Sequence, residues 1–152
     1  MEKKNSAAEG YELLVQGKMM KQNRDEIFRS IRRNYGLKQV EVEVLITLAD
    51  RPAASAKEIA DALFLTKGHV SLAVECLTGK HLISCMRDHT DRRCVRLSLT
   101  AEGKQIADEI FCLKEELDQR MLRGFSEEEI RQFKDYCRRI TENIETERRR
   151  SE

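Results

Sequence analysis

A ten-residue stretch near the middle of the chain constrains the fold more than any other part. It covers residues 91–100 and reads DRRCVRLSLT. Apolar and polar side chains alternate in its second half, where the apolar ones are Val95, Leu97 and Leu99. This period of two is typical of a strand that buries one face. The stretch therefore predicts a strand whose other face, which carries Arg96, is solvated and cationic.

A second strand is predicted just upstream. Residues 82–86 form a short apolar run, and the polar, turn-prone residues 87–93 separate it from the first strand. Two such runs around a turn predict a β-hairpin. Its tip is basic, because Arg87, Arg92 and Arg93 lie in the turn.

Two short helices joined by a tight turn are predicted before the hairpin. Ser55 and Glu58 match a capping box, in which a hydroxyl and a carboxylate satisfy backbone donors at the start of a helix. Thr66 is a candidate cap for the second helix, whose apolar stripe is Val70, Val74 and Leu77. A helix-turn-helix followed by a hairpin makes a winged helix, a common way to hold DNA.

Longer helices are predicted on both sides of this lobe. Apolar residues recur at helical spacing within 8–35, and two further stripes lie within 100–150. Part of 40–49 alternates like a strand, but the spacing of Val44, Leu45 and Leu48 favours a helix. The small lobe cannot cover both C-terminal stripes, so we infer that two chains bury them together in a homodimer.

The predicted fold class is mainly α with a small β-hairpin wing. Residues 1–152 are expected to form a single domain. It comprises an N-terminal dimerisation helix (8–35), a winged helix-turn-helix lobe (38–100) and C-terminal dimerisation helices (100–150). The composition agrees, since 36% of residues are charged, 5% are aromatic and one is proline.

Several classes of protein are excluded by what the sequence lacks. No apolar run approaches the roughly 18 residues of a membrane span, and the polar start leads into no signal peptide, so we expect a cytoplasmic protein without a membrane partner. The five cysteines are an odd number without a C-x-x-C pair, which favours reduced thiols. The three histidines are scattered, so no metal or other cofactor is expected. The chain has no phosphate loop, nucleophile elbow or H-E-x-x-H motif, which argues against an enzyme.

The distribution of charge is compatible with a nucleic-acid partner. The net charge is only +1, but residues 51–100 hold 8 basic against 5 acidic side chains, and residues 101–152 hold 11 against 14. Phosphate binding depends on the local potential at the contact surface. A modest basic centre between neutral or acidic helices therefore suits DNA.

These residues resemble the MarR family of winged-helix transcriptional regulators. The resemblance covers residues 40–103 well and the flanking helices by pattern only. Its most specific parts are Val70-Ser71 in the second helix, Leu82-Ile83 entering the wing, Asp91-x-Arg93, and Leu97-x-Leu99-Thr100-x-x-Gly103. The order of these motifs is more specific than any one of them alone.

The resemblance implies roles for the wing residues. In the family an aspartate typically orients an arginine of the wing, whose tip reaches the minor groove. Here this implies Asp91 as the organiser and Arg93 as the ordered arginine, with Arg92 or Arg87 contacting the backbone or groove. A restrained guanidinium can bond two phosphate oxygens or enter a narrow minor groove. The alternative for Asp91 and Arg93 is a surface ion pair with little energetic meaning.

In a helix-turn-helix the outward side chains of the second helix face the major groove. Leu72 stands where such regulators often carry a basic residue, and it is a candidate for a thymine methyl contact or for packing in the core or on a partner. His69 is either a phosphate or base contact or simply an exposed histidine, and Glu75 repels phosphate if it faces the backbone. The predicted DNA-binding residues are Thr66, Lys67, His69, Ser71, Leu72, Arg87, Asp91, Arg92, Arg93 and Arg96.

The sequence thus favours a dimeric repressor that reads a pseudo-palindromic operator in double-stranded DNA. The resemblance further implies release by a small molecule, commonly an aromatic acid, that lies between the dimerisation helices and the DNA-binding lobe. One alternative is a winged-helix module that binds protein without DNA, which Leu72 and Glu75 favour. A second alternative is a thiol-based redox-responsive regulator that uses Cys85 or Cys94.

Overall fold

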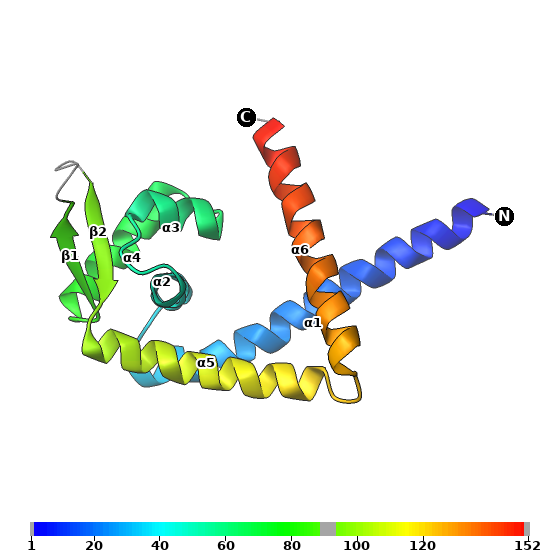
Figure 1. The fold of residues 1–152 in the computed structure, drawn as a ribbon, viewed down its shortest axis with the longest axis horizontal. Coiled ribbons are helices and arrows are strands. Elements are labelled where there is room, and N and C mark those ends of the chain that lie inside the picture. Colours follow the sequence, from blue (N-terminus) through cyan, green and yellow to red (C-terminus); the bar gives the residue numbers. More distant parts are fainter. Residues whose placement is uncertain (1, 89–93, 151–152) are drawn as a thin grey trace. The chain divides into compact units, whose positions relative to one another are not determined.

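The computed structural model describes residues 2–88 and 94–150, which fall into six helices and two strands (Figure 1). Two compact units are formed, residues 1–114 and residues 115–152. The elements in chain order are α1 (Glu2–Tyr35), α2 (Gln39–Asp50), α3 (Ala56–Leu63), α4 (Lys67–Gly79), β1 (Ile83–Arg87), β2 (Val95–Leu99), α5 (Ala101–Met121) and α6 (Glu127–Arg150). The predicted fold class, a mainly helical chain with a small hairpin wing, is confirmed.

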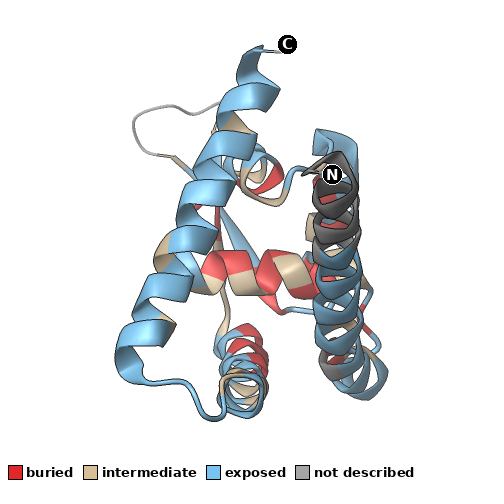
Figure 2. Ribbon diagram, turned by 90° about the vertical axis from the view of Figure 1, so that its right-hand side faces the viewer, coloured by how far each residue is buried: buried red, intermediate tan, exposed pale blue. Residues whose placement is uncertain are grey.

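Helix α2 lies at the centre of the first unit. It is seen end-on in Figure 1 and from the side in Figure 2, where much of it is coloured as buried. Val42, Leu45 and Leu48 are almost fully buried at spacings of three, which confirms the helix predicted for 40–49. The core around it takes side chains from α1, α3, α4, the hairpin and α5, among them Ile31, Ile59, Leu77, Leu97 and Ile110.

The two short helices α3 and α4 form the predicted helix-turn-helix. Ser55 caps α3, since its hydroxyl accepts from the Glu58 amide at 3.2 Å and its own amide donates to the Glu58 carboxylate at 2.7 Å. Phe64 ends α3 in a left-handed conformation, with φ of 54° and ψ of 37°. Thr66 then caps α4 by accepting from the His69 amide. Phe64 is thus one of the few described residues other than glycine that adopt a positive φ in this chain, and it reverses the chain direction between the two helices.

Strands β1 and β2 pair antiparallel, with Cys85 opposite Leu97 and Arg87 opposite Val95. Leu97 is buried, as the alternation predicted, and its amide donates to the Ala54 carbonyl oxygen at 3.0 Å. The prediction that Val95 lies on the buried face is wrong, since 42% of it is exposed. Val95 pairs with the last residue of β1, at the end of the hairpin that extends beyond the core.

The junction between β2 and α5 explains the Leu-Thr-x-x-Gly motif. Thr100 donates its hydroxyl to the His81 carbonyl oxygen at 2.8 Å and accepts from the Gly103 amide at 3.1 Å, so it caps α5. A Cβ atom at Gly103 would lie 1.9 Å from the Leu82 carbonyl oxygen. Only glycine allows the two backbones to approach this closely.

The C-terminal part of the chain is far more exposed. Helix α5 buries Ile106 and Ile110 near its start, whereas its last residue, Met121, is exposed. No residue of α6, all of which is described, is buried (Figure 2). Its apolar stripe lies open to solvent within the single chain and includes Phe133, Tyr136, Ile140 and Ile144. Among the described residues, no helix has the length and apolar character that a membrane span requires.

Candidate nucleic-acid interface

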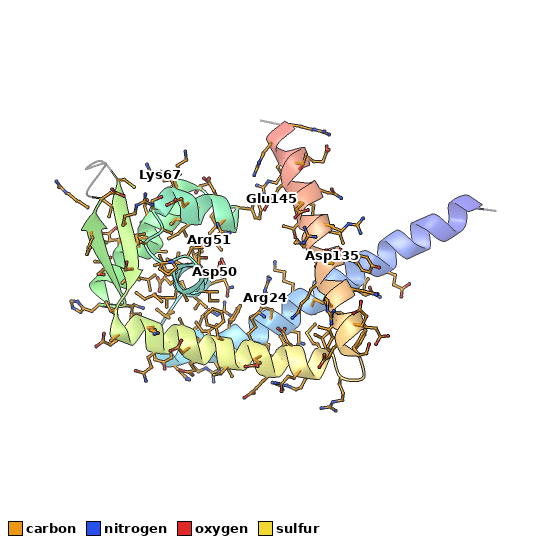
Figure 3. All side chains as sticks on the ribbon, in the orientation of Figure 1. Arg24, Asp50, Arg51, Lys67, Asp135 and Glu145 are labelled. Carbon is orange, nitrogen blue, oxygen red and sulfur yellow. The ribbon has the colours of Figure 1, made fainter. Side chains whose placement is uncertain are left out.

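Helix α4 separates a buried face from a solvent-facing one. Val70, Ala73 and Leu77 pack into the core. The predicted DNA-facing positions Lys67, His69, Ser71 and Leu72 are all exposed, and Lys67 lies at the surface of the lobe at the start of the helix (Figure 3). Leu72 is 63% exposed, which excludes the alternative that it packs in the core of its own chain.

The start of α4 combines a threonine cap with two features that favour a negatively charged partner. Thr66 precedes the helix with its hydroxyl 3.1 Å from the His69 Nδ1 atom and engaged with the His69 amide. Lys67 adds a positive side chain to the first turn. Backbone amides and the helix dipole give this end a further partial positive charge. This end of α4 therefore suits a phosphate.

Farther along α4, the exposed side chains can distinguish bases rather than phosphates. The Ser71 hydroxyl donates to the Lys67 carbonyl oxygen at 2.8 Å, so its proton is used within the helix. Its oxygen still has acceptor capacity for an amino group on a base edge. Leu72 offers an apolar surface that matches a thymine methyl group, and Glu75 carries a negative charge on the same exposed side.

The tip of the wing lies only partly within the described residues. Arg87 is exposed at the end of β1. Asp91, Arg92 and Arg93, which carry the D-x-R motif, lie outside the residues that the structure describes. Their predicted roles in holding and contacting DNA therefore remain predictions.

Arg96 has partners that the sequence did not predict. Its Nε atom donates to the Asp88 carboxylate at 2.8 Å, and its Nη1 atom donates to the Glu58 carboxylate at 2.9 Å and to the Ala53 carbonyl oxygen at 3.4 Å. The hydrogen bond that Arg96 donates to the Asp88 carboxylate is the largest cause that raises the pKa of Arg96. The pKa of Glu58 is lowered, mainly by the hydrogen bond from the Ser55 side chain. The guanidinium predicted to face DNA is thus engaged by the protein itself.

Polar contacts also fix the C-terminal end of α4. Lys80 directly follows this helix, and its ammonium group donates to the Gly36 carbonyl oxygen and lies 3.6 Å from the Glu41 carboxylate. The Glu41 side chain is only 4% exposed. Lys80 therefore joins the end of α4 to the turn between α1 and α2.

Sequence reasoning identified the exposed face of α4 but missed the contacts of Asp88 and Lys80 and the ion pair between Glu58 and Arg96. The sequence marked Glu58 only as part of a capping box, because its ion pair with Arg96 joins residues that are far apart in the chain. Among the described residues, no group of three or more histidine, cysteine or carboxylate side chains is placed to hold a metal ion. Recognition by the described residues therefore depends on the exposed side chains of α4 and on their hydrogen-bonding groups.

Comparison with a protein-family model gives a match to a winged helix DNA-binding domain over residues 37–103. This span runs from the start of α2 to the glycine that follows the wing, and so contains the whole of the lobe described above.

Two curated relatives are regulators of transcription. The HTH-type transcriptional regulator BilQ of Clostridium symbiosum is 30% identical over 89 residues, which are 59% of this chain and 62% of that protein. The HTH-type transcriptional repressor MdtR of Bacillus subtilis is 27% identical over 116 residues, 76% of this chain and 75% of that protein. The match to BilQ thus leaves more than a third of that relative's length uncovered.

Among solved structures, a MarR family transcriptional regulator from Listeria monocytogenes in complex with a 26mer DNA has a similar fold. The TM-score is 0.80 at 20% identity, and the match covers 89% of each chain. The likeness therefore extends beyond the lobe to the flanking helices.

Proposed function

We propose that this chain is a winged helix-turn-helix transcriptional regulator of the MarR family, which acts as a homodimeric repressor that a small aromatic molecule releases from DNA. The predicted fold is confirmed, because a winged helix DNA-binding model matches residues 37–103 and solved structures of transcriptional regulators share the fold. The proposed family is supported by the two curated relatives, both of which are regulators of transcription.

The proposed contact with DNA places α4 in the major groove. The observation that carries this proposal is that α4 buries one face in the core and leaves the other exposed to solvent. The exposed residues at and after its start are Thr66, Lys67, His69, Ser71 and Leu72. In this arrangement the N-terminal residues of the second helix reach base edges. Lys67 and the capped helix start bind phosphate, and Ser71 and Leu72 contact bases.

The wing supplies the second contact. Arg87 is exposed at the end of β1, and Arg92 and Arg93 follow in the tip, so three cations are available to phosphates or the minor groove. Asp91 orients Arg93 in this proposal. Such contacts fix the register of the protein on the duplex.

Dimerisation is supported by the stripe that α6 leaves exposed. Ile140 and Ile144 are each more than half exposed in the single chain, and large exposed apolar patches mark interaction sites. Two-fold symmetry then calls for a pseudo-palindromic site whose half-site centres lie about 34 to 36 Å apart. In this proposal the helices of 8–35 and 100–150 join the lobe in one dimeric domain, which acts on DNA in the cytoplasm.

Repression is proposed because MdtR, which matches three quarters of the chain, is named as a repressor. Release by a small aromatic effector is proposed from the family resemblance. The effector would act by favouring a dimer geometry in which both copies of α4 no longer fit successive major grooves.

The proposal is tested by selecting bound duplexes from a random DNA pool and measuring affinity at several salt concentrations. Lys67→Ala, Arg87→Ala and the double variant Arg92→Ala with Arg93→Ala should each weaken binding. Each lost phosphate contact should also lower the slope of log affinity against log salt by about one. Arg131→Ala, an exposed arginine on α6, is the matched control and should bind normally.

A chain that selects no duplex, or arginine variants that bind as tightly as the wild type, would contradict DNA binding through these residues. The first result would instead favour a module that binds protein. The exposed Leu72 and the acidic Glu75 on α4 are the observations that support this second function.

A further inference from the structure

We propose that Arg96, Asp88 and Glu58, here called the wing anchor, contribute to DNA binding by fixing the position of the wing and not by touching DNA. This inference rests on the proposed function, because it assigns three residues a role in the same interface. It differs from the predicted pairing of Asp91 with Arg93, which concerns the tip.

The wing anchor joins residues from three parts of the lobe. Arg96 lies on β2, Asp88 directly follows β1, and Glu58 lies in the first turn of α3. Arg96 uses different nitrogen atoms for the two carboxylates, at 2.8 and 2.9 Å, so both bonds form at once. Such a fork of charge-assisted hydrogen bonds fixes direction as well as distance.

The backbone around the anchor is also joined to the helix-turn-helix. Arg96 forms an isolated bridge with Ser55, and the Arg96 Nη1 atom donates to the Ala53 carbonyl oxygen. At the other end of the anchor, the Asp88 amide donates to the Cys94 carbonyl oxygen at 2.9 Å. The anchor therefore holds the hairpin against the start of α3 at the level where the tip begins.

This position matters because the wing and α4 must contact the same duplex. A wing that is already held loses less conformational freedom when DNA binds, which preserves affinity. Without the anchor, the proposed phosphate contacts of the tip arginines can still form, but the wing must become ordered when DNA binds. The free-energy cost of this ordering then lowers the affinity.

The net charge of the wing anchor allows an experiment to distinguish a positioning role from an effect of charge on DNA binding. The anchor contains two carboxylates and one guanidinium, so the formal net charge of the three side chains is −1. If charge alone mattered, removing Asp88 would tighten binding to the DNA polyanion. If the anchor positions the wing, removing the same carboxylate weakens binding.

The experiment compares two acidic residues of the same lobe on the selected duplex. We expect Asp88→Ala to weaken specific binding about fivefold, the size of the cost of ordering one or two side chains. Glu75→Gln on the exposed side of α4 is the matched control, and we expect it to tighten binding because a like charge leaves the surface. Thermal unfolding of both variants checks that the lobe remains folded.

Arg96→Gln provides a second measurement. In the positioning role it weakens binding about as much as Asp88→Ala, the double variant is no weaker than either single variant, and the salt slope is unchanged. Tighter binding by Asp88→Ala, or a salt slope that falls by about one in Arg96→Gln, would overturn the inference. Either result leaves the proposed function intact, because that function is lost only if the wild type selects no duplex.

Discussion

The winged lobe and helix α6 use the same local rules but differ in where their apolar side chains go. Both contain a serine-glutamate capping box, formed by Ser55 with Glu58 in the lobe and by Ser126 with Glu129 before α6. The lobe buries most of its apolar residues within the chain, with Leu72 and Val95 among the exceptions, whereas none of the residues of α6 is buried. The pattern of the lobe is thus largely satisfied within one chain, and the exposed stripe of α6 is the feature on which the proposed homodimer rests.

The lobe also contains close contacts that make it intolerant of small changes, and Gly103 gives the largest expected effect. In Gly103→Ala the new methyl group meets the Leu82 carbonyl oxygen at 1.9 Å, so the backbone of the junction must move. We expect the free energy of unfolding to fall by about 3 kcal/mol or more. Urea denaturation at fixed protein concentration measures this loss.

Gly79→Ala is the control for this prediction. A methyl group at Gly79, the last residue of α4, meets nothing within 4 Å. It should leave stability unchanged or raise it by up to about 1 kcal/mol, because alanine favours the helix more than glycine does. Equal stability of the two variants would show that the junction is not tightly packed and would weaken the contrast with α6.

A smaller effect is expected in α6, and it should appear as a change in assembly. Ile140→Ala removes part of an exposed apolar stripe, so in the single chain it leaves no cavity. In the proposed homodimer it should weaken association by about 2 kcal/mol, or roughly 30-fold in Kd. Sedimentation over a range of protein concentrations measures this change.

Arg131→Ala again serves as the control, since Arg131 is a polar, exposed residue of the same helix. It should leave the dimerisation constant unchanged within about threefold. If Ile140→Ala also leaves it unchanged, or if the wild type remains monomeric, the apolar stripe of α6 is not a dimer interface.

The comparison also explains how much of the fold the sequence predicts. Helix starts were predicted at Ser55 and Thr66 because each cap is a local hydrogen bond within three residues. The caps at Thr100 and Ser126 are local in the same way. The alternation in β2 placed Leu97 correctly. It failed at Val95, because a period of two says which face a residue occupies and not how far the core extends along the strand.

For the candidate site, the sequence predicted which side chains are exposed better than which side chains form hydrogen bonds with one another. The exposed positions of α4 follow from helical spacing, which is local. The partners of Arg96 do not, since Glu58 and Asp88 reach it only after the lobe has folded. Charge patterning alone therefore marked Arg96 as a cation for DNA when it already has two carboxylates.

The smallest expected effect comes from the two capping boxes, because the same serine-to-alanine substitution can be made in the lobe and in α6. Ser55→Ala should lower the free energy of unfolding of the lobe by about 1 kcal/mol, the usual value of a serine cap. Ser126→Ala should instead fray the first turn of α6 and leave the unfolding midpoint of the lobe unchanged. Hydrogen exchange measured by mass spectrometry locates each loss.

The pH dependence of the lobe tests the same cap in a different way. The pKa of Glu58 is lowered from its ordinary value of 4.5, mainly by the hydrogen bond from Ser55. A carboxyl group whose folded pKa is lowered stabilises the fold above its ordinary pKa, and this contribution is lost as the pH falls through the folded pKa. Wild-type stability should therefore fall on acidification below about pH 4.5, and that fall should be shallower in Ser55→Ala. Parallel pH profiles in the two proteins would mean that the Ser55 hydroxyl does not set the ionisation of Glu58.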